Sequence, residues 1–369
     1  MIKRNTIDNN KETPLLSCGV EFNGKLYIAS AQNNELYEYD CKTECLHYIT
    51  CFEKEKDIPY LYRTCVVYKE KAWFIPQLAE NIAVVDLNTF EIEYIPLKYK
   101  WIEDSVSLKC TAAGIYQSHY LYVIPYDIDS VILIDMDTKD IRALDVRNNH
   151  EEKYSDAYYY NGYLYCIPWT ADSILKINVA TGETQQQEWQ FGKKQYSQTV
   201  VDYEKEEVWF TPAQATNILK LNLEKKEWSI FPLLENQGKN VENYIGSYYG
   251  KIIDSHVFML PFSSKKIIAV NKNDGSVDSY KYEMEKDMIP FFKPIYSNKL
   301  YAVIEYTNSL LLYNEKQDCF EKKELNLIID NAFKKMRYEK MQSKIIHDGI
   351  AKETGFAGLK QYIKNILGE

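Results

Sequence analysis

The sequence contains little of what several common kinds of protein require. It has 14 glycines, 11 prolines and only 5 histidines in 369 residues. Its 44 Lys and Arg are outnumbered by 53 Asp and Glu, which gives a net charge of −9. A nucleic-acid-binding face needs an excess of positive charge, and so does a polybasic membrane surface. We therefore expect neither nucleic acid nor a membrane among the partners of this protein.

Long apolar runs are also missing. The first residues, MIKRNTIDNNKETPLL, contain no stretch that would form the apolar core of a signal peptide, and no later segment is long enough to span a bilayer. We therefore expect a cytoplasmic protein. Its eight cysteines would then be mostly reduced side chains of the core.

Motifs for metals and nucleotide cofactors are scarce as well. Cys41, Cys45, His47 and Cys51 suggest zinc ligands, but no Cys-x2-Cys pair is present. An extended strand would also hold these side chains too far apart for a tetrahedral site. The glycines form no phosphate-binding loop and no dinucleotide fingerprint. We expect no metal and no cofactor.

What the sequence does contain is a repeat, present seven times. Each copy has an apolar stretch built around an aromatic residue, as in GKLYIAS, KAWFIP and YLYCIP. The spacing between successive aromatics runs from 43 to 49 residues, a period typical of β-propeller blades. The aromatic residues are Tyr27, Trp73, Tyr122, Tyr165, Trp209, Phe258 and Tyr301.

Two further positions recur at fixed distances from this aromatic. Three residues after it stands Pro76, Pro125, Pro168, Pro212 or Pro261, with Ser30 and Ile304 in the first and last copies. Ten residues later stands an Asp or Asn in all seven copies: Asp40, Asp86, Asp135, Asn178, Asn222, Asn271 and Asn314. Such a residue at a strand end bonds to backbone two positions on. This favours an Asx-turn over the other interpretation, a ring of metal ligands.

Each copy predicts four strands. In the fourth copy, YSDAYYY and YLYCI flank an Asn-Gly hairpin turn, and ILKIN and TQQQEW follow after short loops. Four antiparallel strands every ~45 residues define the blade of a β-propeller. We predict an all-β fold, a seven-bladed β-propeller over residues 15–326, with a helical C-terminal tail over residues 327–369. Seven complete blades can close a ring without a strand from the other terminus, although residues 1–14 could pair at an outer edge.

The repeat resembles that of kelch-like bacterial β-propellers, whose blades carry a similar Gly-Lys-Leu-Tyr-hydrophobic strand. The resemblance covers about residues 15–325. It implies a ring-shaped binding platform or scaffold and, in some members, an enzyme.

The C-terminal tail follows a helical pattern. Apolar residues recur on one stripe of LIIDNAFKKMRYEKMQSKII, and GLKQYIKNIL predicts a second short helix. Two interpretations remain for these helices. They cap a face or the rim of the propeller, or they mediate association with a partner or a second copy. The apolar stripe consists of Ile329, Phe333, Met336, Met341 and Ile345.

The candidate site lies at one end of the ring. The loops between strands two and three and the loops between blades meet at this end, and function is often carried on loops. Charged groups, amides and aromatic rings around a concavity suit a polar ligand such as a sugar or a peptide. An internal Arg63–Asp156 ion pair is the structural alternative. The candidate binding residues are Arg63, Asp156 and Gln198 from the inner strands, and Tyr126, Trp169, Gln214 and Phe262 from the loops.

These residues support two hypotheses about function. The first is a cytoplasmic binding or scaffolding propeller that holds a protein partner or a polar ligand at the loop face. The second is a lyase or glycan-modifying enzyme with its chemistry at the mouth of the central channel. Asp156 and His150 are then the candidate catalytic residues, since His150 is the one histidine expected on the loop face.

Overall fold

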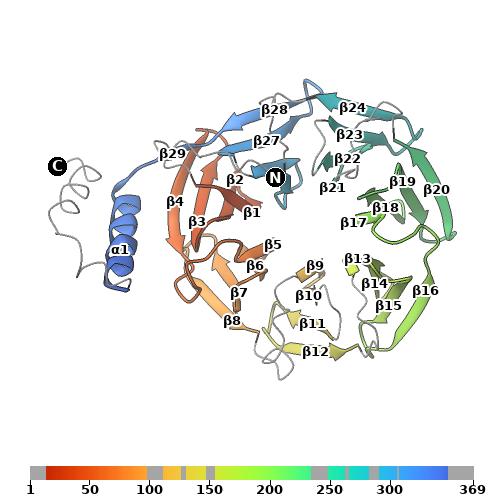
Figure 1. Ribbon diagram of the computed structural model, residues 1–369, viewed down its shortest axis with the longest axis horizontal. Helices are drawn as coiled ribbons and strands as arrows, with labels where there is room; N and C mark the ends of the chain where they lie inside the picture. Colours follow the sequence, from red (N-terminus) through yellow and green to blue (C-terminus); the bar gives the residue numbers. More distant parts are fainter. Residues whose placement is uncertain are drawn as a thin grey trace.

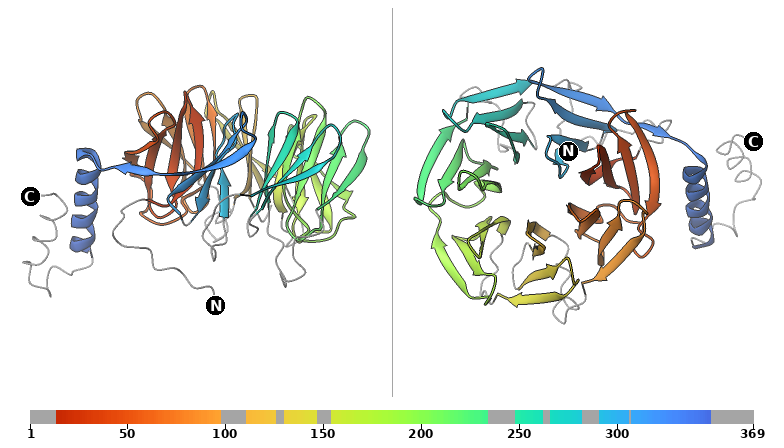
Figure 2. Two further views of the ribbon diagram at one scale, coloured as in Figure 1. Left: turned by 90° about the horizontal axis from the view of Figure 1, so that it is seen from above. Right: turned by 180° about the vertical axis from the view of Figure 1, so that it is seen from behind.

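The computed structural model describes residues 14–97, 111–125, 130–146, 154–233, 248–261, 266–281, 291–305 and 307–347. They form seven β-sheets arranged as blades around a central axis (Figure 1). The blades follow one another around the ring in chain order, as the views from above and from behind in Figure 2 also show. The predicted seven-bladed β-propeller is confirmed.

Every blade is a meander of antiparallel strands, with strand one nearest the axis and strand four at the rim (Figure 1). Blade 1 contains β1 (Leu16–Phe22), β2 (Lys25–Ser30), β3 (Glu35–Asp40) and β4 (Cys45–Cys51). Blade 2 contains β5 (Tyr62–Tyr68), β6 (Lys71–Pro76), β7 (Asn81–Asp86) and β8 (Ile92–Pro96). Blade 3 contains β9 (Thr111–Gln117), β10 (Tyr120–Pro125), β11 (Ser130–Asp135) and β12 (Ile141–Asp145). Blade 4 contains β13 (Tyr154–Tyr160), β14 (Tyr163–Pro168), β15 (Ser173–Asn178) and β16 (Thr184–Glu188).

The remaining three blades have the same order of strands. Blade 5 contains β17 (Tyr196–Asp202), β18 (Glu207–Pro212), β19 (Asn217–Asn222) and β20 (Glu227–Pro232). Blade 6 contains β21 (Tyr248–Ile253), β22 (His256–Pro261), β23 (Lys266–Asn271) and β24 (Val277–Lys281). Blade 7 contains β25 (Phe291–Pro294), β26 (Tyr301–Glu305), β27 (Ser309–Asn314) and β28 (Cys319–Glu324).

The recurring Asp or Asn makes the predicted turn in all seven blades. The carboxylate of Asp40 accepts the backbone N–H of Lys42 at 2.7 Å, and the side-chain oxygen of Asn178 accepts that of Ala180 at 2.9 Å. Because each of these side chains is bonded within its own turn, they are turn residues and not a ring of metal ligands. The same bond, to an N–H two or three positions on, is made by Asp86, Asp135, Asn222, Asn271 and Asn314.

The recurring proline ends strand two, and in four of the five blades that carry it the proline lies opposite a β-bulge in strand one. The pairing of Pro261 with Tyr248 has no bulge. Proline has no N–H to donate, so the ladder between the two strands is interrupted there. A bulge re-aims the side chains beside it. Arg63 and Ser155 are the extra residues of two such bulges, at the loop end of the ring. The bulged pairs are Tyr62 with Pro76, Thr111 with Pro125, Tyr154 with Pro168, and Tyr196 with Pro212.

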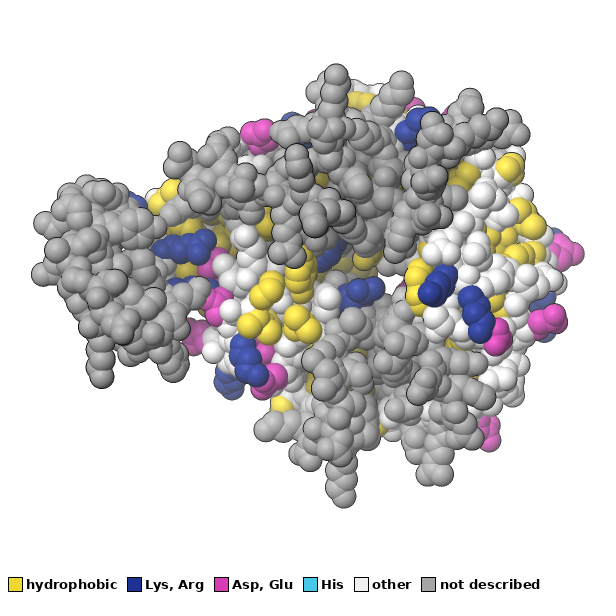
Figure 3. All heavy atoms as spheres, viewed as in Figure 1, with side chains coloured by type: hydrophobic (Ala, Val, Ile, Leu, Met, Phe, Trp, Pro, Cys, Tyr) yellow, Lys and Arg dark blue, Asp and Glu magenta, His cyan; other side chains and the backbone are white. Residues whose placement is uncertain are grey.

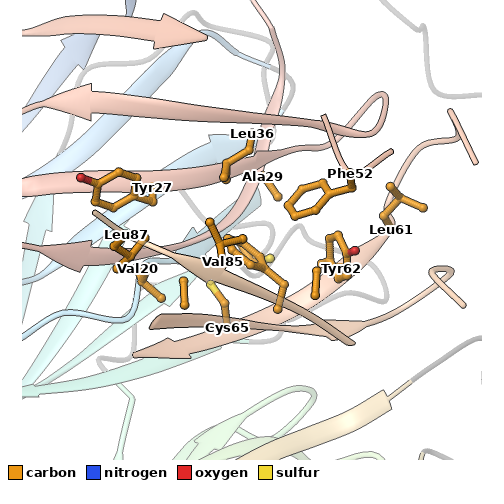
Figure 4. Close-up of a cluster of buried hydrophobic side chains, with 14 residues drawn as sticks. Val20, Tyr27, Ala29, Leu36, Phe52, Leu61, Tyr62, Cys65, Val85 and Leu87 are labelled. Atoms are coloured by element: carbon orange, nitrogen blue, oxygen red, sulfur yellow. The ribbon is translucent and has the colours of Figure 1, made fainter. Parts of the chain in front are cut away.

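The hydrophobic core lies between neighbouring blades. In the close-up of Figure 4, Val20 and Tyr27 of blade 1 pack with Cys65 and Val85 of blade 2, and all four side chains are buried. Each blade therefore buries its apolar faces only when its neighbours are folded. We infer that the ring unfolds as one unit.

The blades converge near the axis. Several inner strands carry a small residue there, at the same position of their register with strand two. A Cβ added to Gly114 would lie 2.2 Å from Ile75 Cδ1 in blade 2. A Cβ added to Gly250 would lie 2.1 Å from Val200 Cγ2 in blade 5. The register places Gly19, Cys65, Ala157 and Thr199 at the equivalent positions of other blades.

A fifth strand completes blade 1. β29 (Asn326–Ile328) pairs in parallel with β4, so the chain that leaves blade 7 covers the outer edge of the first blade. The expectation that residues 1–14 could pair at an outer edge falls almost wholly outside the described residues, and residue 14 is not in a strand.

Helix α1 (Asn331–His347) lies outside the ring at the rim of blade 1 (Figures 1 and 2). Asp330 caps its first turn, because its carboxylate accepts the backbone N–H of Phe333 at 2.9 Å. Phe333 and Met336 are buried against blade 1, as the helical stripe predicts. Ile329 precedes the helix and is 51% exposed.

The rest of the predicted tail pattern cannot be followed in the structure. The side chains of Met341 and Ile345 and the second helix of the tail lie outside the described residues. In the part of the chain that is described, no helix is long and apolar enough to cross a bilayer.

Candidate functional site

The loop end of the inner strands brings together charged and polar side chains from five blades. We call this cluster the channel mouth. Figure 3 looks onto this end of the ring, and Lys or Arg atoms stand near the middle of the disc. The channel mouth consists of Ser17 (β1), Arg63 (β5), Asp156 (β13), Gln198 and Thr199 (β17), and Lys293 (β25).

Asp156 is the carboxylate of the channel mouth, and Thr199 of the next blade holds it in place. The Thr199 backbone N–H donates to Asp156 Oδ2 at 2.7 Å, and the Thr199 hydroxyl donates to the same oxygen at 2.9 Å. These bonds and the positive charge of Arg63 favour the ionised carboxylate, but burial opposes them and dominates. Burial raises the pKa of Asp156 to about 6, against an ordinary value of 3.8.

Arg63 occupies the bulge of β5, two blades away from Asp156 around the ring. Its side chain is half-buried, and its guanidinium forms no hydrogen bond or ion pair with any residue of the described ranges. The structural alternative, a direct Arg63–Asp156 ion pair, is therefore wrong. Arg63 acts on Asp156 only as a charge at longer range. A half-buried guanidinium with five free N–H donors is ready to bind a ligand.

Lys293 adds a second cation to the channel mouth. It extends from blade 7 to Ser17 of blade 1, whose hydroxyl oxygen lies 3.1 Å from the Lys293 ammonium. The same ammonium lies 4.8 Å from the centre of the Tyr60 ring, close to the start of β5. The two cations of the mouth, Lys293 and Arg63, are therefore on neighbouring parts of its wall.

The structure places the remaining sequence candidates as follows. Gln198 and Trp169 are half-buried at the loop end, and Gln214 is exposed there. The Gln214 side chain stands on the loop after β18, beyond the inner strands that form the channel mouth. Tyr126, Phe262 and His150 lie outside the described residues.

The described residues show no catalytic metal centre. In the described ranges, no group of three or more His, Cys, Asp or Glu side chains could hold a metal ion. Of the zinc candidates, Cys51 contacts the hydroxyl of Tyr48 at 3.2 Å and Cys45 donates to the Thr43 carbonyl at 3.4 Å. These thiols are engaged locally in blade 1.

Sequence reasoning missed Lys293 and Thr199. Lys293 stands in the shortest of the inner strands, in a copy that lacks the proline of the repeat. The usable signal was its charge, as it is for Arg63 and Asp156 on the inner strands of other blades. Thr199 is a small residue of the inner strand whose role depends on contact with Asp156 of the neighbouring blade, which no local pattern encodes.

No protein-family model matches the chain, and no curated protein is similar to it in sequence. Several solved structures are similar in fold. A streptogramin B lyase is 13% identical with a TM-score of 0.61, over 80% of this chain and 92% of the other. A catalytically inactive virginiamycin B lyase from Staphylococcus aureus, solved with quinupristin, is also 13% identical with a TM-score of 0.61, over 80% of this chain and 94% of the other.

A bacterial surface protein gives a similar comparison. PorZ of the type-IX secretion system of Porphyromonas gingivalis is 12% identical with a TM-score of 0.60, over 86% of this chain and 39% of that one. At such identities the likeness establishes the class of fold alone. The chain is a seven-bladed β-propeller.

Proposed function

We propose that this protein is a binding module whose channel mouth holds a polar ligand, a sugar or a segment of a peptide. The observation that carries the proposal is the half-buried Arg63 guanidinium, which has no partner among the described residues and stands two blades from Asp156 around the ring. Polar groups that are partly withdrawn from water are costly unless they are bonded, and a ligand with hydroxyl or amide groups supplies those bonds.

The electrostatics of the mouth favour a ligand with both donors and acceptors. Arg63 and Lys293 offer only N–H donors, while ionised Asp156 accepts. A sugar hydroxyl or a peptide amide can satisfy both kinds of group at once. A protein partner at the loop face would bind in the same way, by inserting such a group into the mouth.

We extend the proposal to the family and the cellular location of the protein. We place the protein among kelch-like bacterial propellers on the basis of its Gly-Lys-Leu-Tyr strand, and in the cytoplasm. Reduced cysteines suit that compartment, and the seven cysteines of the described ranges are free thiols. Association through the tail would use the side of α1 that faces away from blade 1, because Phe333 and Met336 are buried.

The test is a thermal-shift screen of the full chain against neutral mono- and disaccharides and short peptides, followed by calorimetry on each hit. A ligand at 100 times its Kd should stabilise the chain by about 2.7 kcal/mol. The hit should lose at least about tenfold in affinity in Arg63→Ala, which corresponds to ~1.4 kcal/mol. Lys193→Ala is the matched control, because this cation is exposed and pairs with Asp172 at the same end. Equal affinity in both variants, or no hit in either panel, would contradict the proposal.

A lyase is the second candidate, and one observation favours it. The pKa of Asp156, raised to about 6, lies near neutral pH, where a carboxyl group is an effective general acid or base. The first substrate to assay is quinupristin, the compound present with the similar virginiamycin B lyase. Turnover of quinupristin by the native chain and its loss in Asp156→Asn would support the enzyme. Absence of turnover would leave binding as the function.

A further inference from the structure

One position of the β-bulges in strand one holds a small residue in every bulged blade but one. It is the residue that follows the last pair before the bulge, at the loop end of the ring. Blade 2 has Arg63 at this position. Because serine or alanine is enough to build the same bulge elsewhere, the fold does not need an arginine there. The small residues at the equivalent positions are Ser17, Ala112, Ser155 and Ser197.

The Arg63 side chain does not join neighbouring blades either. At the equivalent position of blade 4, the Ser155 hydroxyl donates to the Tyr196 carbonyl of blade 5 at 3.5 Å. Lys251, a cation of the inner strand of blade 6, donates to the Ser297 carbonyl of blade 7. The guanidinium of Arg63 forms no such bond within the described ranges, although the residue is half-buried. An arginine that neither the bulge nor a neighbouring blade uses is available to a ligand.

Lys293 brings a second positive charge to the same level of the channel mouth. Its ammonium donates to the Ser17 hydroxyl at 3.1 Å, and Ser17 is the residue of blade 1 that corresponds to Arg63. The same ammonium lies 4.8 Å from the centre of the Tyr60 ring, three residues before Arg63 in the chain. Both cations therefore stand on the side of the mouth that blades 1 and 2 form.

The backbone that carries Arg63 is held firmly on both sides. Just before it, the Leu61 carbonyl accepts the backbone N–H of Gln77 at 2.7 Å. The Tyr62 ring is buried and packs against Phe52, with ring centres 4.7 Å apart. A ligand that binds the guanidinium therefore does not have to order the strand that presents it.

The carboxylate of the mouth stands on another side. Asp156 belongs to blade 4, two blades from Arg63, and both bonds from Thr199 go to one of its oxygens, Oδ2. In Figure 3 the Lys or Arg atoms near the middle of the disc are closer to the axis than the Asp and Glu atoms that are visible. The mouth therefore has a positive side on blades 1 and 2 and an acceptor on blade 4. This polarity suits a ligand with an acid group and hydrogen-bond donors.

From this arrangement we propose that the ligand of the channel mouth is a carboxylic acid, whose carboxylate binds Arg63 beside Lys293 and whose hydroxyl or amide groups donate to Asp156. This inference rests on the proposed function and narrows its ligand. The planar guanidinium matches the two carboxylate oxygens, and the Lys293 charge adds attraction at longer range. A doubly charged phosphate fits less well, because ionised Asp156 repels the second negative charge.

The test is calorimetric titration of the full chain with two pairs of compounds. D-glucuronate is compared with D-glucuronamide, and a blocked glycine–glutamate–glycine peptide with its glutamine counterpart. The members of a pair have nearly the same shape and differ by one negative charge, and the two pairs distinguish a sugar acid from an acidic peptide. We expect the acid of at least one pair to bind at least about tenfold more tightly than its amide.

Variants locate the negative charge of the ligand. Arg63→Gln keeps a polar side chain and removes the charge, so it should raise the Kd of the acid at least about tenfold and abolish the preference over the amide. Lys293→Met should raise the Kd of the acid about threefold, because this charge acts at longer range. Lys193→Met is the matched control and should change neither Kd, since Lys193 is exposed at the same end and pairs with Asp172.

Equal Kd values for acid and amide in both pairs would overturn the inference. They would leave the proposed function standing if both compounds lose affinity in Arg63→Gln. A preference for the acid that persists in Arg63→Gln would place the negative charge away from Arg63 and would also overturn the inference. Tighter binding of glucose 6-phosphate than of either acid would overturn the choice of a carboxylate. If none of these compounds binds, the proposed function fails as well.

Discussion

The ammonium of Lys340 in helix α1 lies 3.0 Å from the carboxylate of Glu35, a side chain of β3 with no exposed surface. Tyr37 donates its hydroxyl to the same carboxylate, and Arg337 approaches it at 3.7 Å. A buried carboxylate needs a cation and hydrogen bonds to remain ionised. Both cations belong to helix α1, so the tail supplies the positive charge that balances the buried Glu35 carboxylate of blade 1.

The first prediction concerns this contact. Lys340→Met should lower the free energy of unfolding by about 2–3 kcal/mol, because it leaves Glu35 with the more distant Arg337 as its only cation. Urea denaturation of the full chain measures the change. Lys335→Met on the same helix is the control, since its pairing with Glu339 is solvent-exposed and is worth about 0.5 kcal/mol or less. Equal losses in the two variants would show that Glu35 does not depend on Lys340.

The second prediction uses the ionisation of Asp156. Its pKa is raised from 3.8 to about 6 in the fold, so the native state binds more protons than the unfolded chain between these values. This group therefore lowers stability as pH rises through that interval, and above it the loss is constant. The total is on the order of 2–3 kcal/mol. Asp156→Asn cannot ionise and can still accept the bonds from Thr199.

Urea denaturation at two pH values checks this. Asp156→Asn should be more stable than the native chain at pH 7, by up to about 2–3 kcal/mol, and the difference should shrink towards pH 4. Asp172→Asn is the control at the same end, because Asp172 is largely exposed and pairs with Lys193. Equal destabilisation of Asp156→Asn at both pH values would contradict this prediction. It would show that the Asp156 carboxylate stabilises the fold whatever its ionisation.

The third prediction tests the close approach of blades at the axis. Gly250→Ala places a Cβ against Val200 Cγ2 and should cost about 1–3 kcal/mol. Val200→Ala removes the opposing methyl groups, so the double variant should be more stable than the sum of the two single losses predicts. The prediction is wrong if the loss in the double variant equals the sum of the losses in Gly250→Ala and Val200→Ala. Such additivity would show that the two side chains do not compete for this space.

The fourth prediction concerns the recurring turn. Asn178→Ala removes the bond to the Ala180 N–H and should cost about 0.5–1.5 kcal/mol. Asn178→Asp should be nearly neutral, because Asp86 makes the same bond in blade 2. Thermal denaturation of both variants gives the comparison. A larger loss of stability in Asn178→Asp than in Asn178→Ala would contradict the role of Asn178 as a turn residue.

The sequence predicts the fold because each blade repeats its own local signals. The aromatic of strand two, the proline three residues later and the Asp or Asn of the next turn act within one blade, so their spacing alone identifies the strands and their order. The meander fixes where each inner strand begins, so the sequence indicates that Asp156, Arg63 and Gln198 lie at the loop end, and their role there stays a prediction.

Contacts between blades could not be predicted in this way. The Thr199–Asp156 bonds, the reach of Lys293 to Ser17 and the carbonyl partner of Lys251 each join residues from different repeats. Their geometry depends on how many blades close the ring and on how closely the blades approach the axis. The parallel pairing of β29 with β4 was missed for the same reason, since a three-residue strand carries almost no periodic signal.

The pairing of Asn326 with Cys45 has a consequence for how the chain is made. The two partners are 281 residues apart, so β4 emerges from the ribosome long before the strand that covers its edge. An uncovered strand edge is a template for pairing with other chains. Until residues 326–328 have been made, this edge of a nascent chain is open to pairing with a strand of another chain. A chain truncated before Asn326 would keep the edge of β4 unpaired by β29.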